Sequence, residues 1–225
     1  MKKVITTMVT FVMFLFYANA NEIYIKQISG TSTSVTISQS GTGNTIGDST
    51  AVSTTMDIDG SSQTIVINQD GSNNALTGYL KGANSDYTID LAGSSNTQEI
   101  NLNATSSIFD FDVTGSSNEL IFNAGAITGI DNLDFDALIV GDSNTFDIDI
   151  LGDDVVDDLD IDGDSNSITI DQAAFTAGLT NGHMITLDVT GDSNTITLDQ
   201  QATTTQNIIG LEINGSSGTW SVTQQ

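Results

Sequence analysis

The segment Ile185–Gln200, ITLDVTGDSNTITLDQ, contains the pattern that decides the fold of this chain. Apolar residues alternate with Thr and Asp on both sides of a polar turn that begins at Gly191. Because such alternation puts successive side chains on opposite faces, it predicts two short, half-buried strands joined by the turn. The apolar face of one strand–turn–strand unit is too small to fold alone.

The same unit recurs along the chain, each time around a turn that begins with glycine. The repeat-turn glycines are Gly41, Gly60, Gly71, Gly93, Gly115, Gly141, Gly163, Gly191 and Gly215. Six steps span the 144 residues from Gly71 to Gly215, a mean of 24, and single steps vary from 22 to 28. We therefore expect insertions in loops. Self-similarity at this period predicts an all-β, single-domain β-solenoid, in which stacked units bury one another's apolar faces.

An antiparallel β-sandwich is the alternative, because it also has short strands at even spacing. A sandwich has no reason to repeat a G-[SD]-S-N turn at one phase, so the repeat favours the solenoid. We expect about eight rungs over residues 31–225, after an N-terminal segment at 21–30. At ~4.8 Å per rung the body would be roughly 40 Å tall. The absence of Pro suits a fold in which nearly every backbone N–H joins a ladder.

Residues 1–20 are expected to be a secretory signal peptide. Lys2 and Lys3 precede an apolar run at Val9–Tyr17, and Ala18-Asn19-Ala20 offers a small-x-small cleavage pattern. A retained membrane anchor is the alternative, but the apolar run is shorter than the roughly 20 residues of a spanning helix. We therefore expect a mature chain from Asn21 that is secreted, extracellular or on the cell surface, without a membrane span.

Composition excludes several functional classes. The chain has 29 Asp and Glu against 4 Lys and Arg, a net charge of −25, and no Cys. Nucleic acid is an improbable partner, because phosphate binding needs clustered cations. Without Cys there is no disulfide framework, thiolate metal site or Cys nucleophile. We expect a chain that is not an enzyme.

Asn and Gln recur at inward-facing positions, where a lone amide would be costly to bury. In a stack, the same amide recurs on every rung and can bond to the next one, forming a ladder. The spacing Gln-x4-Asn occurs at Gln39–Asn44 and Gln69–Asn74, and Asn-x5-Gln at Asn166–Gln172 and Asn194–Gln200. The full set of candidate ladder residues is Gln39, Asn44, Gln63, Gln69, Asn74, Asn96, Asn118, Asn144, Asn166, Gln172, Asn194, Gln200 and Gln224.

The pattern Gln-x-Gly-x-x-Asn followed by x5-Gln resembles the curlin repeat, the unit of the curli family of secreted bacterial amyloid subunits. Gln63–Ala75, QTIVINQDGSNNA, matches best, and Thr33–Asn44, TSVTISQSGTGN, is next. The resemblance implies export across the outer membrane and polymerisation into surface fibres of this chain or of related curlin-like subunits. It also implies a role in biofilm matrix and in adhesion to host or abiotic surfaces.

Several positions depart from this repeat. The Gln before the turn is aliphatic in six later units, and the Gln after it is aliphatic in four middle ones. These residues are Leu91, Val113, Ile139, Ile161, Val189 and Ile213, and then Leu80, Leu102, Ala124 and Ile150. These aliphatic replacements predict that the middle repeats form a stable solenoid in their own right. With the strong negative charge, they leave open a non-polymerising adhesin, surface or appendage protein.

No cofactor is expected, and the acidic residues offer only a weak calcium candidate. Asp158, Asp160 and Asp162 precede Gly163 as in the start of an EF-hand loop, but Thr169 stands where the final bidentate Glu is required. A solvated acidic face explains the Asp row more simply. Paired carboxylates for a glycosidase would need a cleft and a raised pKa.

Three further features have simple structural explanations. His183 follows Asn181-Gly182 and is expected in a surface loop, since no G-x-S-x-G element accompanies it. Outward Thr rows such as Thr195-x-Thr197 resemble those of ice- or carbohydrate-binding solenoids, although Asp interrupts most of them. Trp220 occupies an inward position and is expected in the core or at an end cap.

Overall fold

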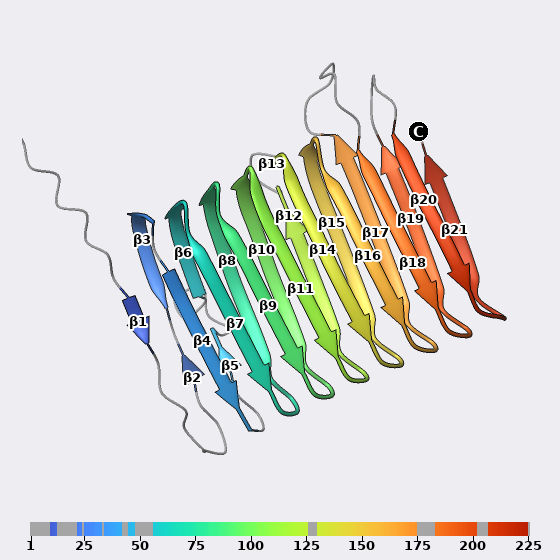
Figure 1. Ribbon diagram of the computed structural model, residues 1–225, viewed down its shortest axis with the longest axis horizontal. Helices are drawn as coiled ribbons and strands as arrows, with labels where there is room; N and C mark the ends of the chain where they lie inside the picture. The colour runs from blue at the N-terminus through green and yellow to red at the C-terminus, as the bar shows by residue number, and fades with distance from the viewer. Residues whose placement is uncertain are drawn as a thin grey trace, which may run out of the picture.

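The computed structural model describes residues 10–12, 22–23, 25–32, 34–41, 45–47, 56–125, 130–174, 183–201 and 207–224. Over these residues the chain is all-β. It forms two sheets, and the strands within each sheet pair only in parallel. Figure 1 shows the strands stacked side by side along the long axis, from the N-terminal end to the C-terminal end. The β-solenoid prediction is confirmed, and the parallel pairing excludes the antiparallel sandwich.

The first sheet has nine strands. In spatial order they are β1 (Thr10–Val12), β4 (Ser34–Ser40), β7 (Thr64–Asp70), β9 (Asp86–Ala92), β11 (Ser107–Thr114), β14 (Leu133–Val140), β16 (Val156–Asp162), β18 (Met184–Thr190) and β20 (Ile208–Asn214). Eight of these strands, from β4 onward, fall in the predicted repeat region at 31–225.

The second sheet has twelve strands. Its main path is β2 (Glu22–Ile23), β5 (Thr45–Ile46), β8 (Ala75–Ala83), β10 (Thr97–Thr105), β12 (Glu119–Ala124), β15 (Thr145–Asp153), β17 (Ser167–Ala174), β19 (Thr195–Gln201) and β21 (Thr219–Gln224). Three strands lie beside this path: β3 (Lys26–Thr31), β6 (Met56–Ser61) and β13 (Ile130–Asp131). Since β2 pairs with β5 and β3 with β6, residues expected to be a separate N-terminal segment continue this sheet. Likewise β1, inside the expected signal peptide, pairs with β4.

One corner of every rung is a glycine turn. Gly115 has a φ of 135°, and a Cβ built on it would lie 1.7 Å from the carbonyl oxygen of Gly93 one rung away. The third turn residue, such as Ser117 with φ 59°, adopts the left-handed conformation that closes the turn. The stacked turn glycines are Gly41, Gly71, Gly93, Gly115, Gly141, Gly163, Gly191 and Gly215.

Gly60 does not belong to this column. It lies in β6 and pairs with Gly82 of β8, next to the opposite corner of the rung. That corner is formed by residues such as Asn84 and Ser106, with φ of 53° and 51°. The extra residues of the longer repeat steps fall in 126–129, 175–182 and 202–206, outside the described residues.

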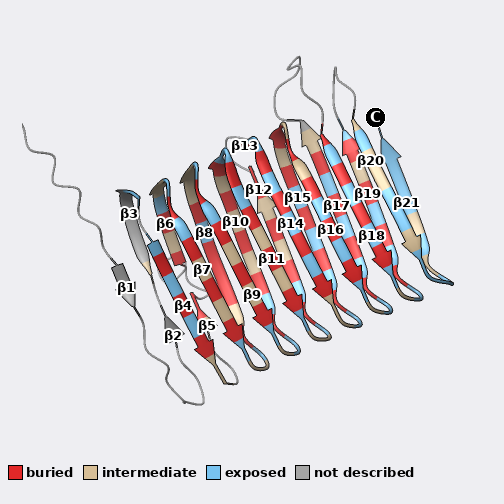
Figure 2. Ribbon diagram, in the orientation of Figure 1, coloured by how far each residue is buried: buried red, intermediate tan, exposed pale blue. Residues whose placement is uncertain are grey.

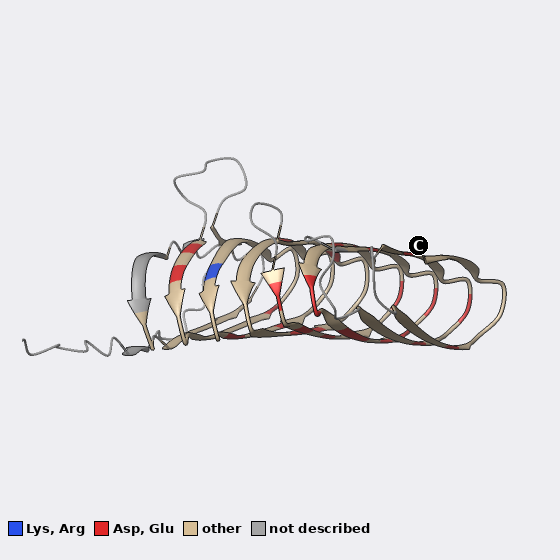
Figure 3. Cartoon of the chain, turned by 90° about the horizontal axis from the view of Figure 1, so that it is seen from above, with Lys and Arg blue, Asp and Glu red and all other residues tan. Residues whose placement is uncertain are grey.

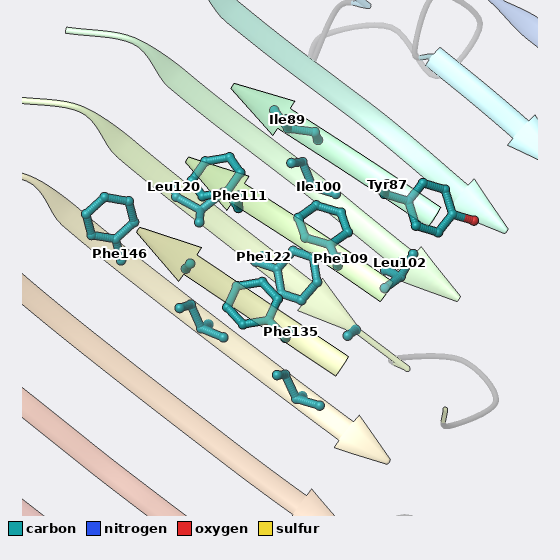
Figure 4. Packing of buried hydrophobic residues seen from close by; sticks show 14 of the residues in the cluster. Tyr87, Ile89, Ile100, Leu102, Phe109, Phe111, Leu120, Phe122, Phe135 and Phe146 are labelled. Atoms are coloured by element: carbon teal, nitrogen blue, oxygen red, sulfur yellow. The ribbon is translucent and has the colours of Figure 1, made fainter. Parts of the chain in front are cut away.

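The core runs between the two sheets as one continuous apolar column, visible as alternating buried residues along the strands in Figure 2. Its middle is aromatic: the ring of Phe109 lies 4.7 Å from Phe122 and 5.7 Å from Phe135, centroid to centroid (Figure 4). Tyr87 joins the cluster at 6.0 Å from Phe109, and burial raises the pKa of its hydroxyl to about 12. The aliphatic residues that depart from the repeat, such as Leu91 and Leu102, are buried in this core beside the aromatic cluster. No helix among the described residues is long and apolar enough to cross a membrane.

Candidate assembly interface

A ladder of buried asparagines follows the glycine corner. The backbone N–H of Asn118 donates to Oδ1 of Asn144 in the next rung at 2.9 Å. The same bond, at 2.8–3.0 Å, joins Asn74 to Asn96, Asn96 to Asn118, Asn144 to Asn166 and Asn166 to Asn194. Amide-to-amide bonding, the form expected from sequence, accompanies it between Asn118 Nδ2 and Asn144 Oδ1 at 3.2 Å. The ladder thus satisfies corner N–H groups that the strands do not pair.

The asparagine ladder ends at the C-terminal rung. Gly218 occupies the next corner position, and a Cβ built on it would lie 2.1 Å from the indole of Trp220. Trp220 is half-buried and packs against the core. In the last rung glycine therefore takes the place of the asparagine, and the indole of Trp220 lies over it.

Glutamine ladders lie at the two ends of the solenoid. Near the N-terminal end, Gln69 Nε2 donates to Gln39 Oε1 at 2.8 Å. Near the C-terminal end, Gln200 donates to Gln172 at 2.8 Å and Gln224 donates to Gln200 at 3.0 Å, each from Nε2 to Oε1. The middle rungs carry aliphatic residues at these positions instead, so these glutamine ladders are confined to the ends while the apolar core continues past them.

Two candidate ladder residues lie elsewhere. Gln63 is buried at the corner opposite the glycine turns, where its backbone N–H donates to Ser85 Oγ at 3.2 Å. It is therefore not in the column of Gln39 and Gln69. Asn44 lies outside the described residues.

Sequence reasoning missed two ladders that use short side chains. At the second corner, Ser85 N–H donates to Ser107 Oγ at 3.2 Å; the 22-residue spacing of these serines was the available signal. At the exposed turn position after glycine, Asp142 Oδ1 accepts from Asp164 N–H at 2.7 Å, and Asp164 accepts from Asp192 N–H. The second position of the GDSN turn is therefore a carboxylate ladder.

His183 corrects an expectation. It is only 2% exposed and lies at the second corner, with its backbone N–H donating to Asn207 Oδ1 at 3.3 Å. Burial lowers the pKa of its imidazole, with an opposing effect from Asp153. The prediction of a surface-loop histidine was wrong, because the residue occupies a corner position like that of Ser85 and Ser107.

Acidic residues occur at intervals along the strands and turns of the solenoid (Figure 3). Asp136 pairs in register with Asp110 and Asp158, and burial together with the like charges of Asp134, Asp158 and Asp110 raises the pKa of its carboxyl. The calcium candidates Asp158, Asp160 and Asp162 are all exposed on the outer face of β16. Over the residues that the structure describes, no group of three or more His, Asp or Glu side chains is arranged to hold a metal ion.

The C-terminal rung leaves the core open. Leu187 and Leu198 are fully buried, whereas Leu211 and Val222, their register partners one rung on, are 38% and 46% exposed. β20 and β21 are the last strands of the two sheets, so each has one edge without a pairing strand among the described residues. Exposed strand edges are templates for another chain.

Comparison with family models, with curated proteins and with solved structures found no match to this chain.

Proposed function

We propose that this chain is a secreted structural protein, a curli-like subunit that stacks end to end into extracellular amyloid-type fibres. The open C-terminal rung carries the proposal: its inward side chains Leu211 and Val222 are exposed, and its strands each have one edge without a pairing strand among the described residues. Adding one more rung would bury these side chains at about 25 cal/mol per Å² of apolar surface and pair both edges. Parallel pairing along both sheets would let the end strands of one copy continue the sheets of another.

The proposed setting follows from the remaining features. The expected signal peptide at 1–20 would deliver the chain outside the cell, and fibres there would serve surface adhesion and biofilm matrix. Function would lie in the repeat and its ladders, with no catalytic site. The net charge of −25 opposes stacking, but salt reduces the Debye length to about 8 Å at physiological strength.

The test follows fibre formation by thioflavin fluorescence and electron microscopy at increasing NaCl, using the secreted chain. We expect salt-accelerated, seedable fibres with a reflection near ~4.8 Å along the axis. The double variant L211K/V222K places charges on the open rung and should abolish fibres. The variant I108K changes an apolar residue that is 47% exposed on an outer face, and should form them normally. A chain that stays monomeric at high salt, or fibres that tolerate L211K/V222K, would contradict the proposal.

A second candidate is a solitary solenoid that binds a carbohydrate surface, favoured by a hydroxyl array on the twelve-stranded sheet. Two exposed columns run over the last three rungs: Ser167, Thr195 and Thr219, and Thr169, Thr197 and Ser221. Binding to insoluble polysaccharide that T195V/T197V abolishes, in a chain that forms no fibres, would favour this candidate. An ice-recrystallisation assay would separate ice binding from carbohydrate binding.

A further inference from the structure

The glutamine ladder at the C-terminal end begins abruptly. One inward column of the twelve-stranded sheet contains, in register, Leu80, Leu102, Ala124, Ile150, Gln172, Gln200 and Gln224. The change from apolar to polar falls at Gln172. Its neighbour Ile150 has no side-chain acceptor, so the first amide of the ladder needs a partner from elsewhere.

Asp157 supplies that partner from the opposite sheet. Gln172 Nε2 donates to Asp157 Oδ2 at 3.0 Å. Asp157 is 0% exposed and pairs in register with Phe135 and Ile185, so a carboxyl stands at a position that is apolar in the adjacent strands. A buried carboxyl at such a position is costly, and the hydrogen bond to Gln172 offsets part of that cost.

In the structure this contact coincides with one direction along the whole ladder. Oδ2 of Asp157 accepts from Nε2 of Gln172, and Oε1 of Gln172 accepts from Gln200. Gln200 and Gln224 repeat this orientation, each donating Nε2 to the Oε1 of the rung before. Oε1 of Gln224 is therefore the acceptor at the C-terminal end.

We propose that Asp157 is a positioning residue that orients this ladder, so that the C-terminal rung selects the N-terminal rung of a second copy over another C-terminal rung. The inference rests on the proposed fibre function. Register supports this occupant: Gln27 of β3 pairs with Ile58, which pairs with Leu80, so Gln27 belongs to the same column at the N-terminal end. A second copy that continued the sheet in this register would follow Gln224 with Gln27 in the column. Two C-terminal rungs would instead bring two acceptor oxygens together.

The test measures elongation of wild-type fibre seeds by secreted monomer. D157L removes the acceptor and should slow elongation about threefold to tenfold, the factor that one net hydrogen bond contributes. D157N retains an acceptor oxygen and should restore the rate. D160N removes the same charge from the exposed outer face of β16 and should match wild type.

Two further measurements keep the alternatives apart. The double variant D157L/Q224L should be no slower than either single variant, because both disrupt one ladder; additive effects, or D157L at the wild-type rate, would overturn the proposal. In the soluble monomer, side-chain amide exchange of Gln172 should be slow in wild type and D157N and fast in D157L. If wild type never elongates, the fibre function is wrong, while unchanged Gln172 exchange in D157L would overturn the role of Asp157 by itself.

Discussion

Gly115 occupies a corner where the neighbouring rung leaves no room for a side chain. We expect Gly115→Ala to lower the free energy of unfolding by about 3 kcal/mol or more, because φ of 135° is strained for alanine and the Cβ would collide with the Gly93 carbonyl. Urea unfolding followed by circular dichroism measures the change. Gly210→Ala is the matched control, since the nearest atom lies 3.8 Å from its Cβ; equal losses in both variants would contradict the steric account.

Asn144 is the acceptor for a buried N–H that no strand pairs. Asn144→Ala should cost about 1–3 kcal/mol, because it leaves the Asn118 N–H without its partner at the corner. The control is Asn123→Ala, which truncates a half-buried asparagine on an outward position of β12. A difference of less than about 0.5 kcal/mol between the two variants in chemical unfolding would mean that the ladder contributes little.

At the scale of the strand, β16 combines an exposed acidic face with one fully buried carboxyl. Burial, followed by the like charges of Asp134 and Asp136, raises the pKa of Asp157 well above its ordinary value. The folded chain therefore binds a proton more tightly than the unfolded chain. This contribution to stability is fully present below the unfolded pKa, near 3.8, and is lost as pH rises through the raised folded pKa. The pKa is also raised for outer carboxyls, which therefore change stability with pH in the same direction; these are Asp90, Asp112, Asp136, Asp149 and Asp171.

We expect the melting temperature to rise as pH is lowered from 8 toward 5. In high NaCl, screening should reduce the share of this rise in melting temperature that comes from the exposed carboxyls. The share that comes from the buried Asp157 should persist. D157N should abolish the rise in melting temperature that persists in high NaCl, and D160N should leave that rise unchanged. A melting temperature that falls steadily over this range in low salt would contradict the assignment.

At the scale of the molecule, each rung contacts only its neighbours, so stability is close to a sum over rungs. Deleting residues 207–225 removes β20 and β21 and exposes Leu187 and Leu198 at a new end. We expect the shortened chain to stay folded and to melt within about 5 °C of the full chain, as measured by circular dichroism. Collapse of the entire fold would instead identify the C-terminal rung as an indispensable cap.

The limits of sequence reasoning are clearest at the corners. Alternation placed Ile185, Leu187 and Val189 on the buried face correctly, because side-chain direction depends only on strand geometry. Gly60 was grouped with the turn glycines because GSSQ resembles GSSN, but it precedes Gly71 by 11 residues, half of a 22-residue rung. That half-step placed it at the other corner. The direction of the asparagine bonds depends on left-handed residues such as Ser117, whose conformation the alternation of strands does not encode.

The stacking of strands across the long axis also has a mechanical consequence. A pull applied to the two ends of the chain acts perpendicular to the strands, so it peels one strand at a time instead of shearing many at once. Each 22-residue rung, such as the one from Gly93 to Gly115, would release about 75 Å of chain when it opens. Under tension the protein would therefore lengthen rung by rung and absorb work at each step.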